Sequence, residues 1–351
     1  MRGVRPVTRR LLAALVLAAS LTGCGEAPDS LHKTQLLAMG TLINISIWTQ
    51  DDALAQRAIN AVTQEFTRDS ERWHAWKPSA LTKINSAIAA GKPAALDAQT
   101  RDLMVKAQAM AAASDQLFNP AIGRLIALWG FHSDDRPDDP PPGRARIEAL
   151  LKEAPDMTDV HLDGDRLRST NPNVQLDLGG IAKGYAVDLA VDRIRKMGVT
   201  DAIVDAGGDL RAIGRHGDRP WRIGIRNPKG PGVIASLQTR GDESIFTSGD
   251  YERYFTYKGK RYHHIIDPRT GYPSVGAASV TVIDRDAAKA DAAATALMIA
   301  GPKGWRRTAR AMGITDVMLV AQSGTVYMTP SMAGRVEFEA QRPPRVIVNA
   351  P

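Results

Sequence analysis

The spacing of apolar residues predicts a chain that alternates between strands and helices. Strands are expected where apolar and polar residues alternate, and helices where apolar positions recur every three or four residues. Predicted strands lie near 42–48, 160–167, 201–214, 221–227, 244–255, 261–273, 279–283 and 316–328. Predicted helices lie near 51–68, 80–85, 100–113, 144–153, 181–195, 286–301 and 303–312. The mixture predicts an α/β fold of the α+β kind, with mixed sheets flanked by helices in a single domain.

The stretch 174–188, VQLDLGGIAKGYAVD, has the most specific pattern in the chain. An alternating run ending at Leu178 predicts a strand, Gly179-Gly180 a sharp turn, and the residues after the turn a helix. The free N–H groups and positive dipole of a helix N-terminus favour an anion. Lys183 lies in the first turn, where the dipole disfavours a cation. A docked phosphate would explain the lysine; an ordinary strand–turn–helix with a solvated lysine is the alternative.

Residues 1–24 have the pattern of a targeting segment. Four arginines in the first ten residues precede the apolar run 11–21, which is shorter than the roughly 20 residues that span a membrane. The run ends in Leu21-Thr22-Gly23-Cys24, which resembles the bacterial lipoprotein processing box. By that resemblance Cys24 becomes the lipidated first residue of a periplasmic protein anchored to a bacterial membrane, with the inner membrane favoured.

The expected organisation follows from that leader. Residues 25–34 are expected to form a polar tether, 35–340 the folded domain and 341–351 a loosely held tail. The Pro-rich loop 132–144 is the clearest internal linker, yet residues on both of its sides are expected to serve one site, so it does not divide the domain.

Composition excludes several classes of function. The formal net charge is +7, but four of the positive charges lie in the leader, and no basic run is interleaved with aromatic residues, so nucleic-acid binding has no support. Cys24 is the only cysteine, which leaves no disulfide and no catalytic thiol after lipidation. The chain has no GxSxG or Walker A motif, and its seven histidines lack zinc-binding spacing.

Two positions suggest a metal site. Asp291 and Thr295 are four residues apart on the predicted helix 286–301, so their side chains face the same way. A carboxylate and a hydroxyl are oxygen ligands suited to Mg²⁺, and a backbone carbonyl from a Gly-rich turn is a natural third ligand. The alternative is an exposed Asp291 with Thr295 bonding back to its carbonyl.

A histidine and two tryptophans are further candidates. His264 has a side chain suited to a general base, although it could equally be a strand histidine beside a turn. Trp73 and Trp76 could stack on a planar ligand or simply pack in the core.

Taken together, these segments resemble the ApbE family, the FAD:protein FMN transferases. The matching segments are Met39-Gly40-Thr41, Phe118-Asn119-Pro120, Trp129-Gly130-Phe131, 177–188, 205–214, 247–254, 263–273 and 290–297. Each is weak alone, but they follow one order over nearly all of the chain after the leader, which makes the combination specific.

The resemblance implies an α/β fold with FAD in a central cleft and Mg²⁺ at its pyrophosphate. It implies transfer of FMN from FAD to a Thr or Ser hydroxyl of an acceptor protein, usually part of a membrane redox complex, with release of AMP. Asp291, Thr295 and the Gly180 carbonyl would hold the metal, and His264 would activate the acceptor hydroxyl. The implied FAD contacts are Met39, Trp76 rather than Trp73, Leu117, Phe118, Asn119, Asp177, Lys183 and Ile265.

The sequence departs from the family in one respect. Some members carry a further carboxylate just before the metal threonine, where this chain has Ala294. Two other functions remain open: a hydrolase that splits FAD into FMN and AMP, and a lipid-anchored flavin-binding protein without enzyme activity. The Asp291/Thr295 pair and His264 count against storage alone, which requires neither a metal nor a base.

Overall fold

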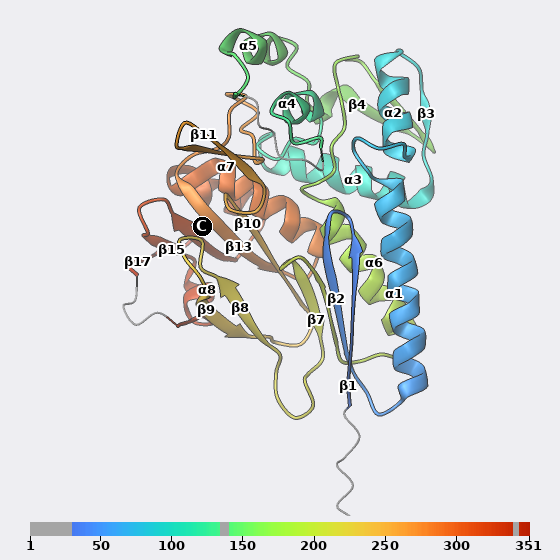
Figure 1. Ribbon diagram of the computed structural model, residues 1–351, viewed down its shortest axis with the longest axis vertical. Helices are drawn as coiled ribbons and strands as arrows, with labels where there is room; N and C mark the ends of the chain where they lie inside the picture. Colours follow the sequence, from blue (N-terminus) through green and yellow to red (C-terminus); the bar gives the residue numbers. More distant parts are fainter. Residues whose placement is uncertain (1–29, 134–139, 340–343) are drawn as a thin grey trace, which may run out of the picture.

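The computed structural model describes residues 30–133, 140–339 and 344–351, and a nine-stranded sheet lies at its centre (Figure 1). The order across this sheet is β1-β2-β6-β7-β10-β13-β14-β15-β17. Every neighbouring pair is antiparallel except β15 and β17, which are parallel. Its strands are β1 (Leu31–Ala38), β2 (Thr41–Trp48), β6 (Ala202–Ala206), β7 (Leu210–Ile213), β10 (Glu243–Gly249), β13 (Ala277–Asp284), β14 (Asp316–Ala321), β15 (Val326–Met328) and β17 (Val346–Val348).

Three small sheets and the helices surround this centre. The small sheets have the orders β3-β5-β4, β16-β9-β8 and β11-β12. Their strands are β3 (Ala94–Ala95), β4 (Val160–Asp163), β5 (Arg166–Ser169), β8 (Arg222–Arg226), β9 (Val233–Gln238), β11 (Tyr254–Tyr257), β12 (Lys260–His263) and β16 (Glu337–Phe338). The helices are α1 (Asp52–Arg72), α2 (Ala80–Ala89), α3 (Ala98–Ala113), α4 (Gly123–Leu128), α5 (Arg144–Lys152), α6 (Ala182–Lys196), α7 (Ala287–Ala311) and α8 (Pro330–Ala333), with a 3₁₀ turn at Met157–Asp159. The predicted α/β class, with mixed sheets flanked by helices, is confirmed.

The large sheet buries both of its faces. Successive residues of a strand point to opposite faces, so Phe246 joins the core beneath α1, α6 and α7, whereas Ile245 joins the core beneath the β8-β9-β16 sheet. A third cluster gathers around Trp129, between α4, α5 and the β11-β12 hairpin. The helix that begins after Gly179-Gly180 is α6, and it lies in the first of these cores, as its nearly continuous apolar surface predicts.

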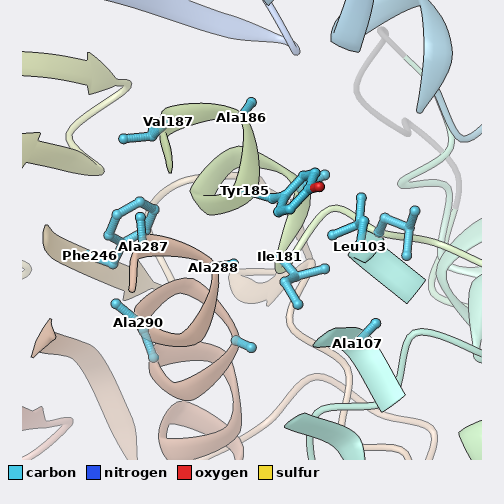
Figure 2. Close-up of a cluster of buried hydrophobic side chains, with 14 of the residues drawn as sticks. Leu103, Ala107, Ile181, Tyr185, Ala186, Val187, Phe246, Ala287, Ala288 and Ala290 are labelled. Atoms are coloured by element: carbon cyan, nitrogen blue, oxygen red, sulfur yellow. The ribbon is translucent and has the colours of Figure 1, made fainter. Parts of the chain in front are cut away.

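The two helices at the centre of the fold touch through their backbones. A Cβ atom added at Gly184 of α6 would lie 2.2 Å from the carbonyl oxygen of Ala287, at the start of α7. Figure 2 shows the alanines at the start of α7 packed beneath α6, beside Phe246 of β10. Small residues on both helices therefore bring the first turn of α6 against the first turns of α7.

Replacing Gly184 with alanine is expected to lower the free energy of unfolding by about 1–3 kcal/mol, because the two helices must move apart. Gly143→Ala is the matched control, since a Cβ at that helix cap meets nothing within 4 Å and its φ of −64° suits alanine. Urea unfolding of both variants measures the difference. Equal stability of Gly184→Ala and Gly143→Ala would contradict this packing.

The ends of the fold differ from the sequence-based boundaries. The tether was expected to reach residue 34, whereas β1 begins at Leu31 because its side chains alternate against β2. A loosely held tail was expected from Gln341, whereas the β-branched run Val346–Val348 pairs with β15 and forms the edge strand of the large sheet. The targeting segment 1–24 with Cys24, and tether residues 25–29, lie outside the described residues. In the described part of the chain, no helix has the length and apolar character needed to cross a bilayer.

The break in α7 agrees with the sequence. Two helices were predicted on either side of Gly301-Pro302, and the structure places a non-helical Gly301 with φ of 61° there. Proline cannot donate the helical N–H bond, and glycine tolerates a positive φ, so the axis changes direction at this point. The first part of α7, before Gly301, carries Asp291 and Thr295.

Candidate active site

The segment before the diglycine turn is extended but is not a strand. The predicted strand ending at Leu178 is wrong, because the segment forms only an isolated bridge between Gln175 and Ile122. The side-chain amide of Asn85 replaces a neighbouring strand: it donates to the Leu176 carbonyl (2.9 Å) and accepts from the Leu176 N–H (2.7 Å). The segment is therefore held by the Asn85 side chain on one side and by a few backbone bonds to residues 120–123 on the other, and not by a continuous strand ladder.

The diglycine turn brings three predicted site residues together. Asp177 N–H, just before the turn, donates to the carbonyl of Pro120 (2.8 Å), which ties the two segments together. A Cβ added at Gly180 would lie 3.2 Å from Thr295 Oγ1 and 3.3 Å from the Phe118 ring. The backbone of Gly180 thus lies directly against Thr295 and Phe118, a proximity that a larger residue would hinder.

Lys183 lies in the first turn of α6, as predicted, and it pairs with carboxylates of the protein. Its ammonium group bonds to Asp209 and lies 3.8 Å from Asp291 Oδ1. Burial alone would lower the pKa of Lys183, but Asp209 and Asp291 outweigh it and raise the pKa. Two buried carboxylates and one ammonium leave this group with a net negative charge, which favours a further cation.

Asp291 and Thr295 face the same side of α7, as their spacing predicts. Asp291 is buried, and its Oδ2 accepts the N–H of Gly184 (3.0 Å). The Thr295 hydroxyl lies 3.3 Å from the Ser248 hydroxyl, and among the described residues it makes no bond back to the Asp291 carbonyl. The pair is therefore directed into the site rather than capped within its own helix.

The donors at this point fit Mg²⁺. They are all oxygens: the Asp291 carboxylate, the Thr295 hydroxyl and the backbone of Gly180 beside it. Burial and the nearby Asp209 raise the pKa of Asp291 to about 6, against the opposing effect of Lys183, and a bound cation would reverse that shift. Ala294 is buried and supplies no ligand.

The described residues contain no group of three His, Cys, Asp or Glu side chains that could enclose a metal ion. A cation here would therefore depend on hydroxyl, carbonyl and water oxygens and on phosphate oxygens of a substrate. Mg²⁺ is commonly bound in this way.

Mg²⁺ binding is expected to weaken by about tenfold per pH unit below pH 6, because the cation must then displace the Asp291 proton. In the metal-free protein, the stability of the fold changes with pH in the opposite direction. The folded state takes up the Asp291 proton near pH 6, whereas the unfolded state takes it up only near pH 4. Asp291 thus contributes stability that is present below pH 4 and lost as pH rises through 6. Thermal unfolding with and without MgCl₂ from pH 5 to 8 checks both trends, and Asp291→Asn should remove both.

A second group of side chains surrounds Asp177. His132 Nε2 lies 2.7 Å from Asp177 Oδ2, and both side chains are almost fully buried. Burial alone would raise the pKa of Asp177, but the bonds from His132 and the Gly179 N–H outweigh it and lower the pKa. The His132 ring also stacks on Trp76, with centroids 5.5 Å apart and planes at 24°.

The two tryptophans have different surroundings. Trp73 is buried in the main core, where its Nε1 donates to Thr100 Oγ1 (3.1 Å) and its ring meets Tyr185 edge-on. Trp76 is only half-buried, and its buried Nε1 has no partner among the described residues. A ligand acceptor would satisfy that N–H, which favours Trp76 over Trp73 as the ligand contact.

His264 follows β12 and is half-buried beside Phe131. Its Nδ1 lies 3.2 Å from the Arg253 carbonyl, which can only accept, so Nδ1 carries the proton and Nε2 keeps its lone pair. Burial, then His263, Arg253 and more weakly Lys183, lower the pKa of His264 well below its usual value. The imidazole is therefore neutral at physiological pH and within electrostatic range of Lys183.

The other predicted contacts are more dispersed. Met39 has a φ of 50° at the turn between β1 and β2, and its N–H donates to Ser70 Oγ (3.0 Å). Leu117 and Ile265 are buried. Asn119 uses its side chain within the protein, accepting from Ala121 N–H (2.9 Å) and donating to the Pro155 carbonyl (3.1 Å), so it shapes the turn that supports Asp177.

Two residues of this site were not predicted. His132 looked like the first residue of a polar linker, and no local pattern pairs it with Asp177, which lies 45 positions away. Asp209 ends the motif Asp205-Ala206-Gly207-Gly208-Asp209, which follows the same Asp-x-Gly-Gly pattern as 177–180. That repeated pattern was the one available signal that a carboxylate stands beside a Gly-rich turn here.

Comparison with protein families gives one match over most of the chain. The model of the ApbE family matches residues 39–319. A curated relative from Rhodobacter capsulatus, named FAD:protein FMN transferase, is 40% identical over 93% of this chain, and the chain spans 62% of that relative's length. A relative of the same name from Vibrio cholerae is 32% identical, over 89% of this chain and 94% of its own length.

Solved structures agree with this match. The ApbE protein of Thermotoga maritima superposes with a TM-score of 0.80 at 34% identity, covering 89% of this chain and all of its own. The apo form of Pseudomonas stutzeri flavinyl transferase ApbE superposes with a TM-score of 0.77 at 29% identity, covering 90% of this chain and 98% of its own.

Proposed function

The chain belongs to the ApbE family of transferases, and on that premise we propose that it moves FMN from FAD to a Thr or Ser hydroxyl of an acceptor protein, releasing AMP. The proposal rests on one observation above all. The diglycine turn and the lysine of α6 meet the Asp291/Thr295 pair of α7 at one point, although α7 lies far along the chain from them.

This point suits a diphosphate. Lys183 supplies an ammonium group, and the turn that ends at Gly180 leads directly into the N-terminus of α6, where the positive end of the helix dipole favours a phosphate. Mg²⁺ held by Asp291, Thr295 and the Gly180 carbonyl would neutralise charge on the diphosphate and orient it. In phosphoryl transfer, positioning and charge neutralisation supply most of the catalysis.

The reaction then needs only one proton acceptor. The acceptor hydroxyl oxygen bonds to the phosphorus of the FMN half, the bond from that phosphorus to the bridging oxygen breaks, and AMP leaves with that oxygen. The hydroxyl proton passes to Nε2 of His264, which holds a lone pair because Nδ1 faces the Arg253 carbonyl. The nucleophile comes from the partner protein, which accounts for the absence of a nucleophile motif in this chain.

The FAD rings would be held by the second group of side chains. Asp177 is an ionised acceptor for ring or ribose donors, and Trp76 offers an N–H that has no partner among the described residues. Met39, the run Leu117-Phe118-Asn119 and Ile265 would complete the walls. Stacking on an aromatic side chain and a few convergent polar groups are the usual means of fixing a planar ligand.

We also propose that the protein acts at a bacterial membrane. The leader and lipoprotein box of residues 1–24 support a lipid anchor at Cys24 on the periplasmic side of a bacterial membrane, favouring the inner one. Acceptors in membrane redox complexes fit that location. Expression of Cys24→Ala beside the natural chain should shift the protein from the membrane to the soluble fraction, and unchanged membrane retention would contradict the anchor.

One assay separates transfer from the alternatives. The full chain in detergent is incubated with FAD, MgCl₂ and a candidate subunit of a membrane redox complex, then analysed for in-gel flavin fluorescence and free AMP. Labelled acceptor together with AMP supports the proposal. AMP without label indicates an FAD hydrolase, and neither product indicates a flavin-binding protein.

A further inference from the structure

We propose that Asp209 is a positioning residue that holds Lys183 away from Asp291 and so keeps the Asp291 carboxylate free for a divalent cation. The inference rests on the proposed function, since it concerns the same cation site. It assigns a role to a carboxylate that is not among the donors expected to hold the metal.

Asp209 is firmly held. It is 7% exposed, its Oδ1 accepts the Thr247 N–H of β10 (2.8 Å), and its Oδ2 bonds to the Lys183 ammonium. The preceding Gly207 and Gly208 have φ values of 74° and 97°, which place Asp209 at the start of β7. Because one oxygen is fixed by the backbone of another strand, the other oxygen is presented to Lys183 in a defined direction.

The Asp209–Lys183 contact affects the metal site because Lys183 also lies near Asp291. The Lys183 Nζ already forms a long ion pair with Asp291 Oδ1 at 3.8 Å, which is beyond hydrogen-bonding distance, and it could close onto that oxygen if Asp209 did not hold it. Asp291 Oδ2 is already occupied by the Gly184 N–H (3.0 Å). An ammonium drawn onto Oδ1 would take a coordination position of the expected metal ligand and would repel the incoming cation.

With Asp209 in place, the positive charge of Lys183 is balanced by the Asp209 carboxylate, and the Asp291 carboxylate remains available to a metal ion. The ammonium then stays bonded to Asp209, at ion-pair distance from Asp291 but without a hydrogen bond to its carboxylate. Asp209 therefore balances the charge of Lys183, while Asp291 remains available to bind the cation.

A double-mutant cycle on Mg²⁺ binding tests the inference without measuring activity. The full chain in detergent, free of FAD, is titrated with MgCl₂ by calorimetry, using the natural chain, Asp209→Asn, Lys183→Met and the double variant. Asp209→Asn keeps the Thr247 bond through its amide oxygen but removes the charge. We expect Asp209→Asn alone to weaken Mg²⁺ binding by about tenfold or more, and by less than about twofold in the Lys183→Met background.

Three outcomes would overturn the inference. Unchanged Mg²⁺ affinity in Asp209→Asn, or an equal loss in the Lys183→Met background, would show that Asp209 does not act through Lys183. Weaker Mg²⁺ binding by Lys183→Met alone would also contradict it, and this arm remains decisive if Asp209→Asn fails to fold. A natural chain that binds no Mg²⁺ without FAD would overturn the inference, because Asp209 would then not keep Asp291 ready for a cation; the metal site of the proposed function is tested separately with FAD present.

Glu252 provides the matched control. It is another carboxylate near Asp209 and Lys183, it is exposed, and it makes no bond to Lys183 in the described part of the chain. Glu252→Gln should change the Mg²⁺ affinity by less than about twofold, because it leaves the Asp209–Lys183 contact intact. A loss as large as that of Asp209→Asn would mean that general negative charge, rather than this contact, controls the site.

Discussion

Replacing Asp291 with alanine is expected to lower the rate of FMN transfer by about a thousandfold or more, because the proposed cation would lose the one carboxylate proposed as its ligand. Thr295 and the Gly180 carbonyl are neutral donors and cannot hold Mg²⁺ without it. Transfer to a labelled acceptor at saturating FAD measures the loss. The fold should persist, since removing a buried carboxylate with a raised pKa also removes a desolvation cost.

Two further variants make that result specific. Asp291→Asn keeps the size of the side chain and an oxygen for the Gly184 N–H, so it should match the alanine variant in activity while remaining fully folded. Asp192→Asn removes an exposed carboxylate from α6 and should leave transfer unchanged. Full transfer by Asp291→Ala would rule out the metal assignment.

Replacing His264 with alanine is expected to slow transfer by about 10²–10⁴-fold at saturating FAD, because the acceptor hydroxyl loses its proton acceptor. The affinity for FAD should change little. Equilibrium binding of FAD, followed by flavin fluorescence, is compared with single-turnover transfer. Since the pKa of His264 is held low, the natural chain should show no loss of activity from this group between pH 8 and pH 6.

Added imidazole is the matched control for His264. A small base can enter the space left by the missing ring and should restore part of the transfer in His264→Ala while leaving Asp291→Ala inactive. Equal losses of FAD binding and of transfer in His264→Ala, without rescue, would assign this residue to binding instead of proton transfer.

The parts of the site that lie on regular helices could be predicted from the sequence. Asp291 and Thr295 share a face because of helical spacing alone, and Lys183 lies in the first turn after a Gly-Gly break. The negative group expected beside Lys183 is present as two carboxylates of the protein. Whether a phosphate also docks there stays a prediction.

Other parts depend on contacts between distant residues, which no local pattern encodes. The alternation before Leu178 has the strand period, yet on one side the Leu176 backbone bonds to the side chain of Asn85, 91 positions away, and on the other side only one isolated bridge forms, so no strand results. His132 carries no periodic signal at all, because its position is defined by Trp76 and Asp177 across the fold. Strand β17 was missed because three apolar residues after a polar stretch are too short to distinguish from a coil.

The central claim is that a cation at Asp291 and Thr295 activates the diphosphate of FAD. A crystal structure of the protein with FAD and Mn²⁺, located by its anomalous scattering, tests it most directly. The predicted result is a cation about 2.1 Å from the Asp291 carboxylate, the Thr295 hydroxyl and the Gly180 carbonyl, bridging to the diphosphate beside Lys183. A diphosphate bound away from Asp291, with no cation between them, would contradict the account.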